Sequence, residues 1–452
     1  MLSDSIFHSY DLRGIWPCEW DKKGVEQIAK AIVKHFSPRT IAIGRDMRLS
    51  SAEIFSVLAE NFIQSGVEVW DLGLVSTDIS YFTSGFLRPD LTLMITASHN
   101  PPEYNGLKIT LPGGESISFE TGFEAVKNLA RQDLVLPKKR GRIVKKNLYP
   151  QYIKAVLSIA KIAKIKPLKI VVDAGNGMAG KVFPQVAKHL PIKYYPLYFE
   201  LDGRFPHHLA NPLLPEAVAV LKKAVISQKA DLGVGFDGDG DRVVLIDEQG
   251  VLFSGTIITA MLAESILKDN PGRVVCYNAI CGRVVPKIIK ENNGIPLRTP
   301  VGYSLIKQIM REKNAVFAGE HSYHFFFPQL YFADSGIMAL IKSLQLISQS
   351  GQKASEIRKK YDLYPQSGEI NFQVEDKEGM MKKVEKKFSQ GAAAVDHLDG
   401  VSLWFTDWWF NLRPSNTEPL LRLNIEADNA WLLAEKEKIL LQFISEKGGK
   451  RI

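Results

Sequence analysis

The chain has 452 residues, of which 45% are hydrophobic and 23% are charged. At roughly 150 residues per domain, this length predicts about three domains. The ordinary composition excludes intrinsic disorder, a collagen-like repeat and a small disulfide scaffold. Its 57 basic and 49 acidic residues leave a net charge of +8, a mild bias that suits a protein binding small anions.

The basic residues are spread along the chain, and their densest cluster runs from Lys138 to Lys146. No helix-turn-helix, zinc or aromatic RNA-binding signature accompanies it, so we expect a solvated connector and no nucleic-acid partner. The three cysteines, Cys18, Cys276 and Cys281, form no CxxC pair, which fits a reducing compartment. We find no signal-peptide pattern and no run of 18 apolar residues, so we expect a cytoplasmic protein without a membrane partner.

A weak internal repeat organises most of the chain. Three times, a strand and a helix-like stretch are followed by a second strand and then by a third strand that runs into a polar loop. This alternation predicts βαβ units with mostly parallel sheets. Ligands gather outside the carboxyl ends of such strands, so three polar loops should line one cleft between domains. The predicted strand segments, some with the loop that follows, are 40–48, 67–73, 90–101, 169–177, 193–199, 231–242, 273–282, 295–302 and 315–324.

Polar or proline-containing stretches at 137–150, 247–250 and 359–368 mark the boundaries between these units. The tail from about residue 366 mixes strand-like runs with one polar loop and a terminal helix, which indicates a smaller α+β domain. The predicted fold is α/β: three tandem α/β domains with mixed, mostly parallel sheets (1–148, 149–252 and 253–364) and a C-terminal α+β domain (365–452), arranged around a central cleft.

The segment TASHNPPEYNGLKI (96–109) places Ser98 just after an apolar strand, beside His99 and ten residues before Lys108. A serine on an exposed loop can be a nucleophile or a phosphate carrier if a neighbour activates it. Ser, Asn and Pro also favour an ordinary turn. No GxSxG elbow is present, which disfavours a hydrolase of the α/β class.

The segment DGDGDR (237–242) crowds Asp237, Asp239 and Asp241 into one loop. Like charges this close repel, so a cation is expected, and oxygen-only ligands suit Mg²⁺ or Ca²⁺. A calcium EF-hand is excluded because Arg242 stands where the loop requires glycine, and because the flanks read as strands. Three carboxylates with room for a phosphate oxygen fit Mg²⁺ that assists phosphoryl transfer.

In GEHSYH (319–324), Glu320, Ser322 and His324 alternate, so an extended loop would point all three side chains the same way, toward sugar hydroxyls. His321 and His324 have the spacing of a zinc pair. No third ligand of the right type is nearby, so we expect no zinc site.

The segment RPSNTEP (413–419) combines Arg413, Ser415, Asn416 and Thr417 with a turn-forming proline. A bidentate cation with hydroxyl and backbone donors makes a phosphate cradle, and a plain turn is the alternative. No Walker loop occurs, which argues against ATP hydrolysis.

Two motifs near the N-terminus, YDLRG (10–14) and GRDMR (44–48), add three arginines. Any of Arg13, Arg45 and Arg48 could contact phosphate, because a guanidinium group binds phosphate oxygens in pairs.

In the order YDLRG, TASHNP, DGDGDR, GEHSYH and RPSNTEP, these motifs resemble the α-D-phosphohexomutase superfamily, and most closely its bacterial phosphomannomutase/phosphoglucomutase members, over essentially the whole chain. The resemblance implies a four-domain, heart-shaped enzyme. It also implies a reversible interconversion of hexose 1-phosphate and hexose 6-phosphate, with mannose phosphates as the first expectation and glucose phosphates as the second. The reaction would pass through a phosphoserine and a hexose 1,6-bisphosphate, which also serves as activator.

The family pattern assigns roles to matching residues of this chain. By that resemblance, the catalytic residues are Ser98, His99, Lys108 and Arg13, with Lys108 as a general acid or base. One Mg²⁺ ion would be held by Ser98, Asp237, Asp239 and Asp241. The substrate-binding residues would be Tyr10, Arg242, Glu320, Ser322 and His324, with Arg413, Ser415, Asn416 and Thr417 on the non-reacting phosphate.

The chain departs from its nearest relatives in pattern at Tyr303, Tyr323 and Ile280, which border the implied sugar and phosphate sites. These positions therefore bear on the preferred sugar. The alternatives are a phosphoglucosamine mutase, a metal-dependent sugar phosphatase and a non-catalytic sugar-phosphate sensor. Hexose phosphates are the expected small-molecule partners of a monomer or weak dimer.

Overall fold

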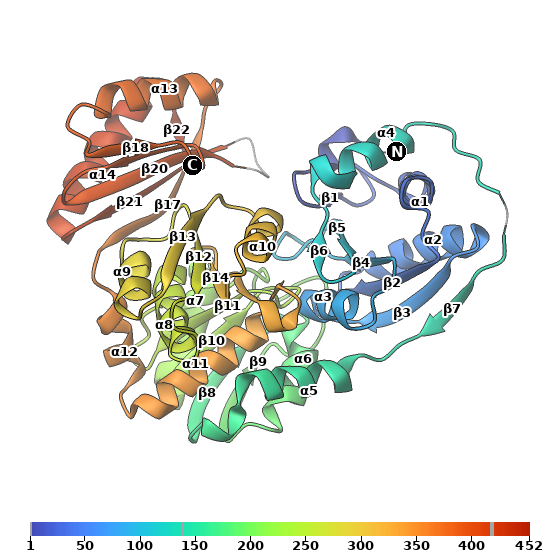
Figure 1. The fold of residues 1–452 in the computed structure, drawn as a ribbon, viewed down its shortest axis with the longest axis horizontal. Helices are drawn as coiled ribbons and strands as arrows, with labels where there is room; N and C mark the ends of the chain where they lie inside the picture. Colours follow the sequence, from blue (N-terminus) through green and yellow to red (C-terminus); the bar gives the residue numbers. More distant parts are fainter. Residues whose placement is uncertain (1, 138, 416–419) are drawn as a thin grey trace.

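The computed structural model describes residues 2–137, 139–415 and 420–452. The described residues form four sheets in chain order, and we call each sheet with its helices a unit, I to IV. Unit I (blue) and unit IV (red) lie at the two ends of the molecule, and units II and III lie between them (Figure 1). The predicted fold class, three α/β units followed by an α+β unit, is confirmed.

Unit I has a mixed sheet with helices packed against it. Its strands are β1 (Leu12–Ile15), β2 (Thr40–Arg45), β3 (Glu68–Leu74), β4 (Leu91–Ile95), β5 (Tyr104–Leu111), β6 (Glu115–Ser116) and β7 (Arg142–Lys145), and its helices are η1 (Asp4–Ile6), α1 (Lys22–Phe36), α2 (Ser51–Gln64), α3 (Thr77–Phe86), η2 (Phe119–Phe123) and α4 (Glu124–Ala130). The strand order is β1-β5-β4-β2-β3-β7, with β6 paired to β5. β4, β2 and β3 are parallel, whereas β5 is antiparallel to both its neighbours β1 and β4.

Local sequence explains several of these elements. β4 is a run of five buried residues, LTLMI, typical of a parallel strand covered on both faces. α1 begins after Asp21, whose side chain accepts a hydrogen bond from the Gly24 N–H at 3.0 Å. It ends where Ser37 adopts φ 47°, the left-handed turn common at helix ends.

The basic connector after unit I is partly a strand. β7 pairs in parallel with β3, so part of the predicted connector is an edge strand, although most of its residues are exposed to solvent as predicted. The edge of β3 offers unpaired backbone groups, and β7 satisfies them. Charged side chains of this segment also contact β3. Arg142 pairs with Glu68 at 2.6 Å, and the Lys146 ammonium group lies 5.2 Å from the centre of the Trp70 ring.

Units II and III repeat the α/β plan. Unit II comprises α5 (Tyr149–Ala160), η3 (Ile162–Lys164), β8 (Leu168–Asp173), α6 (Ala179–Ala187), β9 (Ile192–Leu197), α7 (Pro215–Gln228), β10 (Leu232–Phe236) and β11 (Val243–Asp247). Unit III comprises α8 (Gly255–Leu267), β12 (Val274–Asn278), α9 (Val284–Glu291), β13 (Ile295–Thr299), α10 (Tyr303–Glu312), β14 (Phe317–Gly319), β15 (Phe325–Phe327), η4 (Pro328–Leu330), β16 (Ala333–Asp334), α11 (Gly336–Ser350) and α12 (Ala354–Tyr361). Their sheet orders are β11-β10-β8-β9 and β13-β12-β14-β15-β16. Each of the nine predicted strand segments overlaps an observed strand.

Unit IV is an antiparallel sheet with two helices. It comprises β17 (Gln366–Gln373), α13 (Lys377–Phe388), β18 (Ala394–Asp396), β19 (Val401–Trp404), β20 (Trp408–Pro414), β21 (Leu420–Ala427), α14 (Ala430–Glu446) and β22 (Lys450–Arg451). The strand order is β18-β19-β20-β21-β17-β22, and every pairing between described strands is antiparallel.

The clusters of buried apolar side chains do not follow the division into four sheets. One continuous cluster joins units I, II and III, from Ala42 on β2 to Tyr361 at the end of α12. Alternate residues of β2, Ile41 and Ile43, face a second cluster within unit I, because successive strand residues point to opposite faces. Unit IV has a cluster of its own. Among the described helices, none is both long enough and apolar enough to cross a bilayer.

Candidate active site

Ser98 follows β4 in a tight turn that aims its hydroxyl group at unit II. The residue is buried and adopts φ 51°, in the left-handed region. Its N–H donates to Thr96 Oγ1 at 2.9 Å. Its hydroxyl group donates to Asp237 Oδ2 at 3.0 Å and lies 3.2 Å from His99 Nδ1. The loop therefore brings a serine, a histidine and the first aspartate of the DGDGDR segment together.

His99 and Arg13 flank this serine. Burial, with the charges of Arg242 and Arg13, lowers the pKa of His99 well below its ordinary value, so the imidazole ring is neutral at pH 7. Arg13 donates to Asn100 Oδ1 at 2.7 Å and pairs with Asp11 at 2.5 Å. Its buried Nε has no hydrogen-bond partner among the described residues. Arg13 thus lies beside the Ser98 loop, and its Nε–H group has no acceptor among the described residues.

The second candidate loop joins β10 to β11 and carries three fully buried aspartates, Asp237, Asp239 and Asp241. One oxygen from each lies within 4.8 Å of the others. Within the described structure, Oδ1 of Asp239 and Oδ1 of Asp241 accept no hydrogen bond. Burial and the two neighbouring carboxylates raise the pKa of Asp237 well above its ordinary value. Converging carboxylates with oxygens to spare are the donor set of a hard divalent cation, so these residues fit the predicted metal site.

Lys108, on β5 of unit I, reaches the same carboxylates. Its ammonium group lies 2.9 Å from Asp241 Oδ2 and 3.2 Å from Asp239 Oδ2. Burial lowers the pKa of Lys108, but Asp239 and Asp241 outweigh burial and raise it well above its ordinary value. Burial raises the pKa of Asp239 in turn, and Lys108 outweighs it and lowers that pKa to about 2. The lysine is therefore a buried cation of the site.

Arg242 connects the loops of units II and III. Its N–H donates to Asp237 Oδ1 at 3.1 Å, and its backbone forms an antiparallel bridge with that of His324. With Ser98 on Asp237 and Lys108 on Asp241, the three loops predicted to converge do meet.

The sugar-loop segment is a turn between β14 and β15. The Glu320 N–H donates to the His324 carbonyl group at 2.9 Å, and the Tyr323 N–H donates to the Glu320 carbonyl group at 3.1 Å. The prediction of an extended loop was therefore wrong. Tyr323 adopts φ 70° and reverses the chain, so alternation does not order the side chains of Glu320, Ser322 and His324. Glu320 accepts a hydrogen bond from Asn278 at 3.1 Å.

His324 belongs to a buried charged cluster that the sequence motifs do not include. Its Nδ1 lies 2.9 Å from Asp334 Oδ2 and 3.7 Å from Asp241 Oδ1. The other oxygen of Asp334 lies 2.9 Å from the Lys307 ammonium group, which is 3.2 Å from the centre of the Tyr81 ring. Burial lowers the pKa of Lys307 to about 8. The structure places Lys307 on α10 among the buried residues Ile306 and Met310, and the sequence motifs do not extend to this position.

Thr77 and Asp78, at the start of α3, were also missed. Thr77 Oγ1 donates to Asp239 Oδ2 at 2.6 Å. Asp78 is fully buried and accepts hydrogen bonds from Ser76, Tyr152 and Ser335, which belong to units I, II and III. Burial raises the pKa of Asp78 to about 6. No motif of the sequence analysis includes these residues.

Of the predicted phosphate cradle, Arg413 and Ser415 are described, whereas Asn416 and Thr417 lie outside the described residues. Arg413 is buried at the end of β20, and its Nη2 lies 3.0 Å from Glu369 Oε2. The Ser415 N–H donates to a backbone carbonyl group of β21 at 2.8 Å. The arginine is thus held in place by a carboxylate.

Two of the three N-terminal arginines bind other groups of unit I. Arg45 pairs with Asp71 at 2.7 Å and lies over the Phe55 ring. Arg48 is buried, and its guanidinium group donates to backbone carbonyl groups. Neither side chain points a donor group into the site as predicted for a phosphate contact.

Among the departures from the family pattern, Tyr303 lies at the site. Its hydroxyl group donates to the Tyr10 carbonyl group, and the two rings meet edge to face with centroids 5.7 Å apart. The Lys108 ammonium group lies 5.6 Å from the centre of the Tyr303 ring. Tyr303 therefore joins unit III to unit I beside the catalytic lysine candidate.

The other two departures have their described contacts outside the carboxylate cluster. The Tyr323 hydroxyl group donates to the Phe253 carbonyl group at 3.1 Å, inside the core shared by units II and III. Ile280 is buried among residues of β21 and β17 where units III and IV meet. Both side chains contribute to packing.

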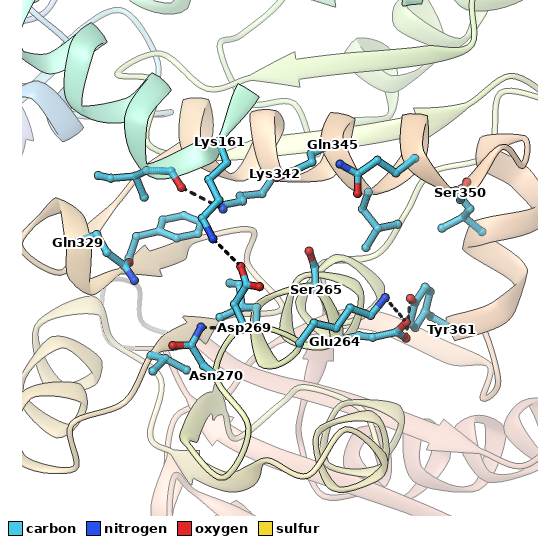
Figure 2. Close-up of a pocket in the computed structure, with 18 of the residues that line it drawn as sticks. Lys161, Glu264, Ser265, Asp269, Asn270, Gln329, Lys342, Gln345, Ser350 and Tyr361 are labelled. Carbon is cyan, nitrogen blue, oxygen red and sulfur yellow. Dashed lines mark hydrogen bonds and ion pairs between the residues drawn. The ribbon is translucent and has the colours of Figure 1, made fainter. Parts of the chain in front are cut away.

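A cavity of about 770 Å³ lies apart from this site, between α5, α8, α11 and α12 (Figure 2). Several of its charged groups pair with one another: Lys161 lies 3.0 Å from Asp269, and Lys360 lies 2.8 Å from Glu264. None of the predicted site residues is among its described lining residues. The chemistry therefore belongs to the loops between the units.

Comparisons with known proteins agree with this geometry. Models of phosphoglucomutase/phosphomannomutase α/β/α domains I, II and III match residues 4–134, 150–250 and 254–364, and the model of the C-terminal domain matches residues 369–441. A phosphomannomutase of Salmonella montevideo is 35% identical over 451 residues, covering 98% of this chain and 99% of the relative. A phosphomannomutase of Methanocaldococcus jannaschii is 36% identical, covering 98% of each chain.

A solved structure supports the same assignment over the whole chain. The phosphoglucomutase/phosphomannomutase family protein of Burkholderia thailandensis superimposes with a TM-score of 0.87 at 28% identity, covering 100% of both chains. The match includes all four units, and the relatives span the full length of the chain. The chain therefore belongs to the phosphoglucomutase/phosphomannomutase family of the α-D-phosphohexomutase superfamily, and it is an intramolecular phosphotransferase that acts on sugar phosphates.

Proposed function

We propose that the enzyme interconverts mannose 1-phosphate and mannose 6-phosphate, with a phosphoryl group carried on Ser98 and a hexose 1,6-bisphosphate as intermediate. The observation that carries the proposal is the 3.0 Å contact between Ser98 Oγ and Asp237, at the meeting point of three loops. The choice of mannose rests on the names of the curated relatives, which include phosphomannomutases. Glucose phosphates are the second expected substrates.

The protonation states support separate roles for His99 and Lys108. When the bisphosphate returns a phosphoryl group, the Ser98 oxygen attacks phosphorus, a P–O(Ser98) bond forms and the bond from phosphorus to the sugar oxygen breaks. The serine proton can pass to neutral His99 Nδ1, 3.2 Å away. Lys108 enters the step charged and stabilises the negative charge that spreads over the transferring group. When the sugar oxygen departs, one proton of the ammonium group can pass to it, which leaves Lys108 as the neutral amine.

The carboxylates of Asp237, Asp239 and Asp241, with phosphorylated Ser98, would hold one Mg²⁺ ion. Bound there, the ion would neutralise charge on the transferring phosphoryl group. The oxygens of Asp239 and Asp241 that lack hydrogen-bond partners support this assignment. Arg13, whose Nε–H group has no acceptor among the described residues, would contact the same phosphoryl group.

The remaining predicted residues would hold the rest of the substrate. Arg413 would bind the non-reacting phosphate, so that either end of the bisphosphate can meet Ser98 from one fixed grip. The full proposed set is Ser415, Asn416 and Thr417 with Arg413 on that phosphate, and Tyr10, Arg242, Glu320, Ser322 and His324 around the sugar.

The test is a coupled assay with mannose 1-phosphate and with glucose 1-phosphate, each with Mg²⁺ and a trace of hexose 1,6-bisphosphate. We expect conversion to the 6-phosphates, with the higher kcat/KM for mannose. Ser98→Ala should remove turnover, while the control Ser227→Ala, on the exposed face of α7, should leave it unchanged. A fully active Ser98→Ala enzyme would contradict the proposal.

Other results would support the alternatives. Free phosphate released as fast as substrate disappears would indicate a phosphatase. Conversion of glucosamine phosphate, with neither mannose nor glucose phosphate converted, would indicate a phosphoglucosamine mutase. Tight binding of hexose phosphates without any conversion would indicate a sensor.

A further inference from the structure

Arg48 lies buried beneath the Ser98 loop, with 2% of its surface exposed. Its Nη1 donates to the carbonyl groups of Pro101 at 2.6 Å and Tyr104 at 2.9 Å. Its Nη2 donates to those of Ser98 at 2.9 Å and Asn100 at 2.6 Å. One side chain thus donates to three carbonyl groups of the loop that carries the serine and to the first carbonyl group of β5.

The loop needs such a partner. Buried carbonyl groups left without a hydrogen bond are costly. Of these four, within the described part of the chain, only the Pro101 carbonyl group also accepts a bond from a backbone N–H outside the strands, that of Tyr104 at 3.1 Å. Ser98 also adopts a left-handed backbone conformation, which a residue other than glycine keeps only when its surroundings enforce it. A guanidinium group offers several donors in one rigid plane, so it can fix several carbonyl groups at once.

Arg48 is itself held firmly. Its Nε lies 3.3 Å from Asp46 Oδ2, and its backbone N–H donates to Asp46 Oδ1 at 3.0 Å. Asp46 also accepts from the Ser51 hydroxyl group at 2.7 Å, and Ser51 accepts from Asn105 at 3.0 Å. The guanidinium group is therefore oriented by a buried carboxylate with its own hydrogen-bonded support.

Unit II packs on the other side of Arg48. The Phe205 ring centre lies 5.1 Å from the guanidinium carbon, and a Cβ on Gly203 would lie 2.6 Å from Arg48 Cα. The same segment reaches the aspartate loop, because the Gly238 N–H donates to the Ala210 carbonyl group at 3.1 Å. A Cβ on Gly238 would lie 2.5 Å from the Ser98 carbonyl oxygen, so the two loops touch directly.

We propose that Arg48 is a positioning residue for phosphoryl transfer: it fixes the Ser98 loop against the aspartate loop so that Ser98 Oγ faces Asp237. It acts through the backbone and contacts no reacting atom. This inference rests on the proposed function of Ser98 as the phosphoryl carrier.

The test uses the full-length enzyme with Arg48→Lys, because one ammonium group cannot reach all four carbonyl groups. The matched control is Arg311→Lys, since Arg311 also donates to backbone carbonyl groups, those of Gly113 and Tyr331, outside the Ser98 loop. The measurements are kcat, KM, the thermal midpoint and the rate at which hexose 1,6-bisphosphate phosphorylates Ser98, followed by intact mass.

We expect Arg48→Lys to lower kcat and the Ser98 phosphorylation rate about a hundredfold, as misplacement of a reacting group by 1 Å can do, while KM changes less than about threefold. Arg311→Lys should lower the thermal midpoint but leave kcat within about threefold of the wild type. Should Arg48→Lys fail to fold, Asp46→Asn loosens the guanidinium group more gently and should lower the phosphorylation rate about tenfold.

An Arg48→Lys enzyme, or in its place an Asp46→Asn enzyme, that phosphorylates Ser98 at the wild-type rate would overturn the inference. Equal kcat losses in Arg48→Lys and Arg311→Lys would overturn it too, since the effect would then follow stability alone. These results leave the proposed function standing if wild-type Ser98 is phosphorylated. A wild-type enzyme that isomerises hexose phosphates with Ser98 unmodified would overturn both.

Discussion

Lys108 and Asp241 form a buried ion pair between units I and II, with 2.9 Å between Nζ and Oδ2. The same ammonium group lies 3.2 Å from Asp239. The carboxylates that would hold a divalent cation are therefore already partly neutralised by a side chain from another unit. Lysine and metal compete electrostatically for the same oxygens, although both would be needed for phosphoryl transfer.

Replacing Lys108 with methionine should separate these two effects. Loss of a positive charge beside the carboxylates should tighten Mg²⁺ binding at least about tenfold, since charges this close interact by more than 1.4 kcal/mol. The same change should lower kcat about a hundredfold, because the charge that stabilises the transferring group is gone. Calorimetric titration with Mg²⁺ and the mutase assay measure the two. Weaker metal binding in the variant would contradict the expectation, and Lys181→Met, on α6, serves as the control.

Arg413 should affect substrate binding more than turnover. A charge-assisted bond to phosphate contributes about 1.5–3 kcal/mol, so Arg413→Ala should raise KM roughly 10- to 150-fold with a smaller change in kcat. Glu369→Gln removes the carboxylate that now pairs with Arg413 and should change KM far less. Steady-state kinetics with both hexose phosphates measure this. An unchanged KM in Arg413→Ala would contradict a role in binding phosphate, and Arg204→Ala, in a surface ion pair, is the control.

Asp78 should make the free energy of unfolding of the protein depend on pH. Burial raises its pKa from 3.8 to about 6, so the folded state binds more protons than the unfolded state between about pH 4 and 6. The stability contributed by this group is full below pH 4 and is lost as the pH rises through 6. The difference in thermal midpoint, wild type minus Asp78→Asn, should therefore decrease as the pH is raised from 4.5 to 7. A difference that stays constant or grows over this range would contradict the assignment.

Tyr323 should matter for stability and not for the choice of sugar. Tyr323→Phe leaves the buried carbonyl group of Phe253 without its hydroxyl donor, which should cost about 1–2 kcal/mol and lower the thermal midpoint. The ratio of kcat/KM for mannose and glucose phosphates should not change, because the side chain points into the core. Thermal unfolding and the two assays measure these effects. A shifted ratio would place this side chain at the substrate.

The positions of the reactive loops were predictable because each follows a strongly apolar strand. Ser98 follows β4, Asp237 follows β10 and Glu320 follows β14, and the carboxyl ends of such strands gather where units meet. Spacing within one loop was informative as well, since the alternating aspartates do converge. For the sugar loop spacing was misleading, because Tyr323 takes a left-handed conformation that no simple alternation anticipates.

The supporting residues could not be predicted in the same way. Arg48 binds a loop some 50 residues further along the chain, and Lys307, Asp334 and Tyr81 come together from different elements and units. Such contacts depend on how the folded units pack against one another. Local patterns such as periodicity and motif spacing do not indicate which residues of different units will meet. The edge strand β7 was missed for a related reason: its pairing is set by the open edge of β3 and not by its own polar composition.

The continuous core of units I to III has a consequence for how the chain is made. Its members run from Ala42 to Tyr361, so the apolar faces of units I and II cannot be fully covered until most of the chain has left the ribosome. Contacts between such distant residues form slowly, and exposed apolar faces invite aggregation while they wait. The internal cluster of unit I can close early, and unit IV can close by itself at the end. Chaperones that shelter nascent chains should therefore matter most during synthesis of the middle of this protein.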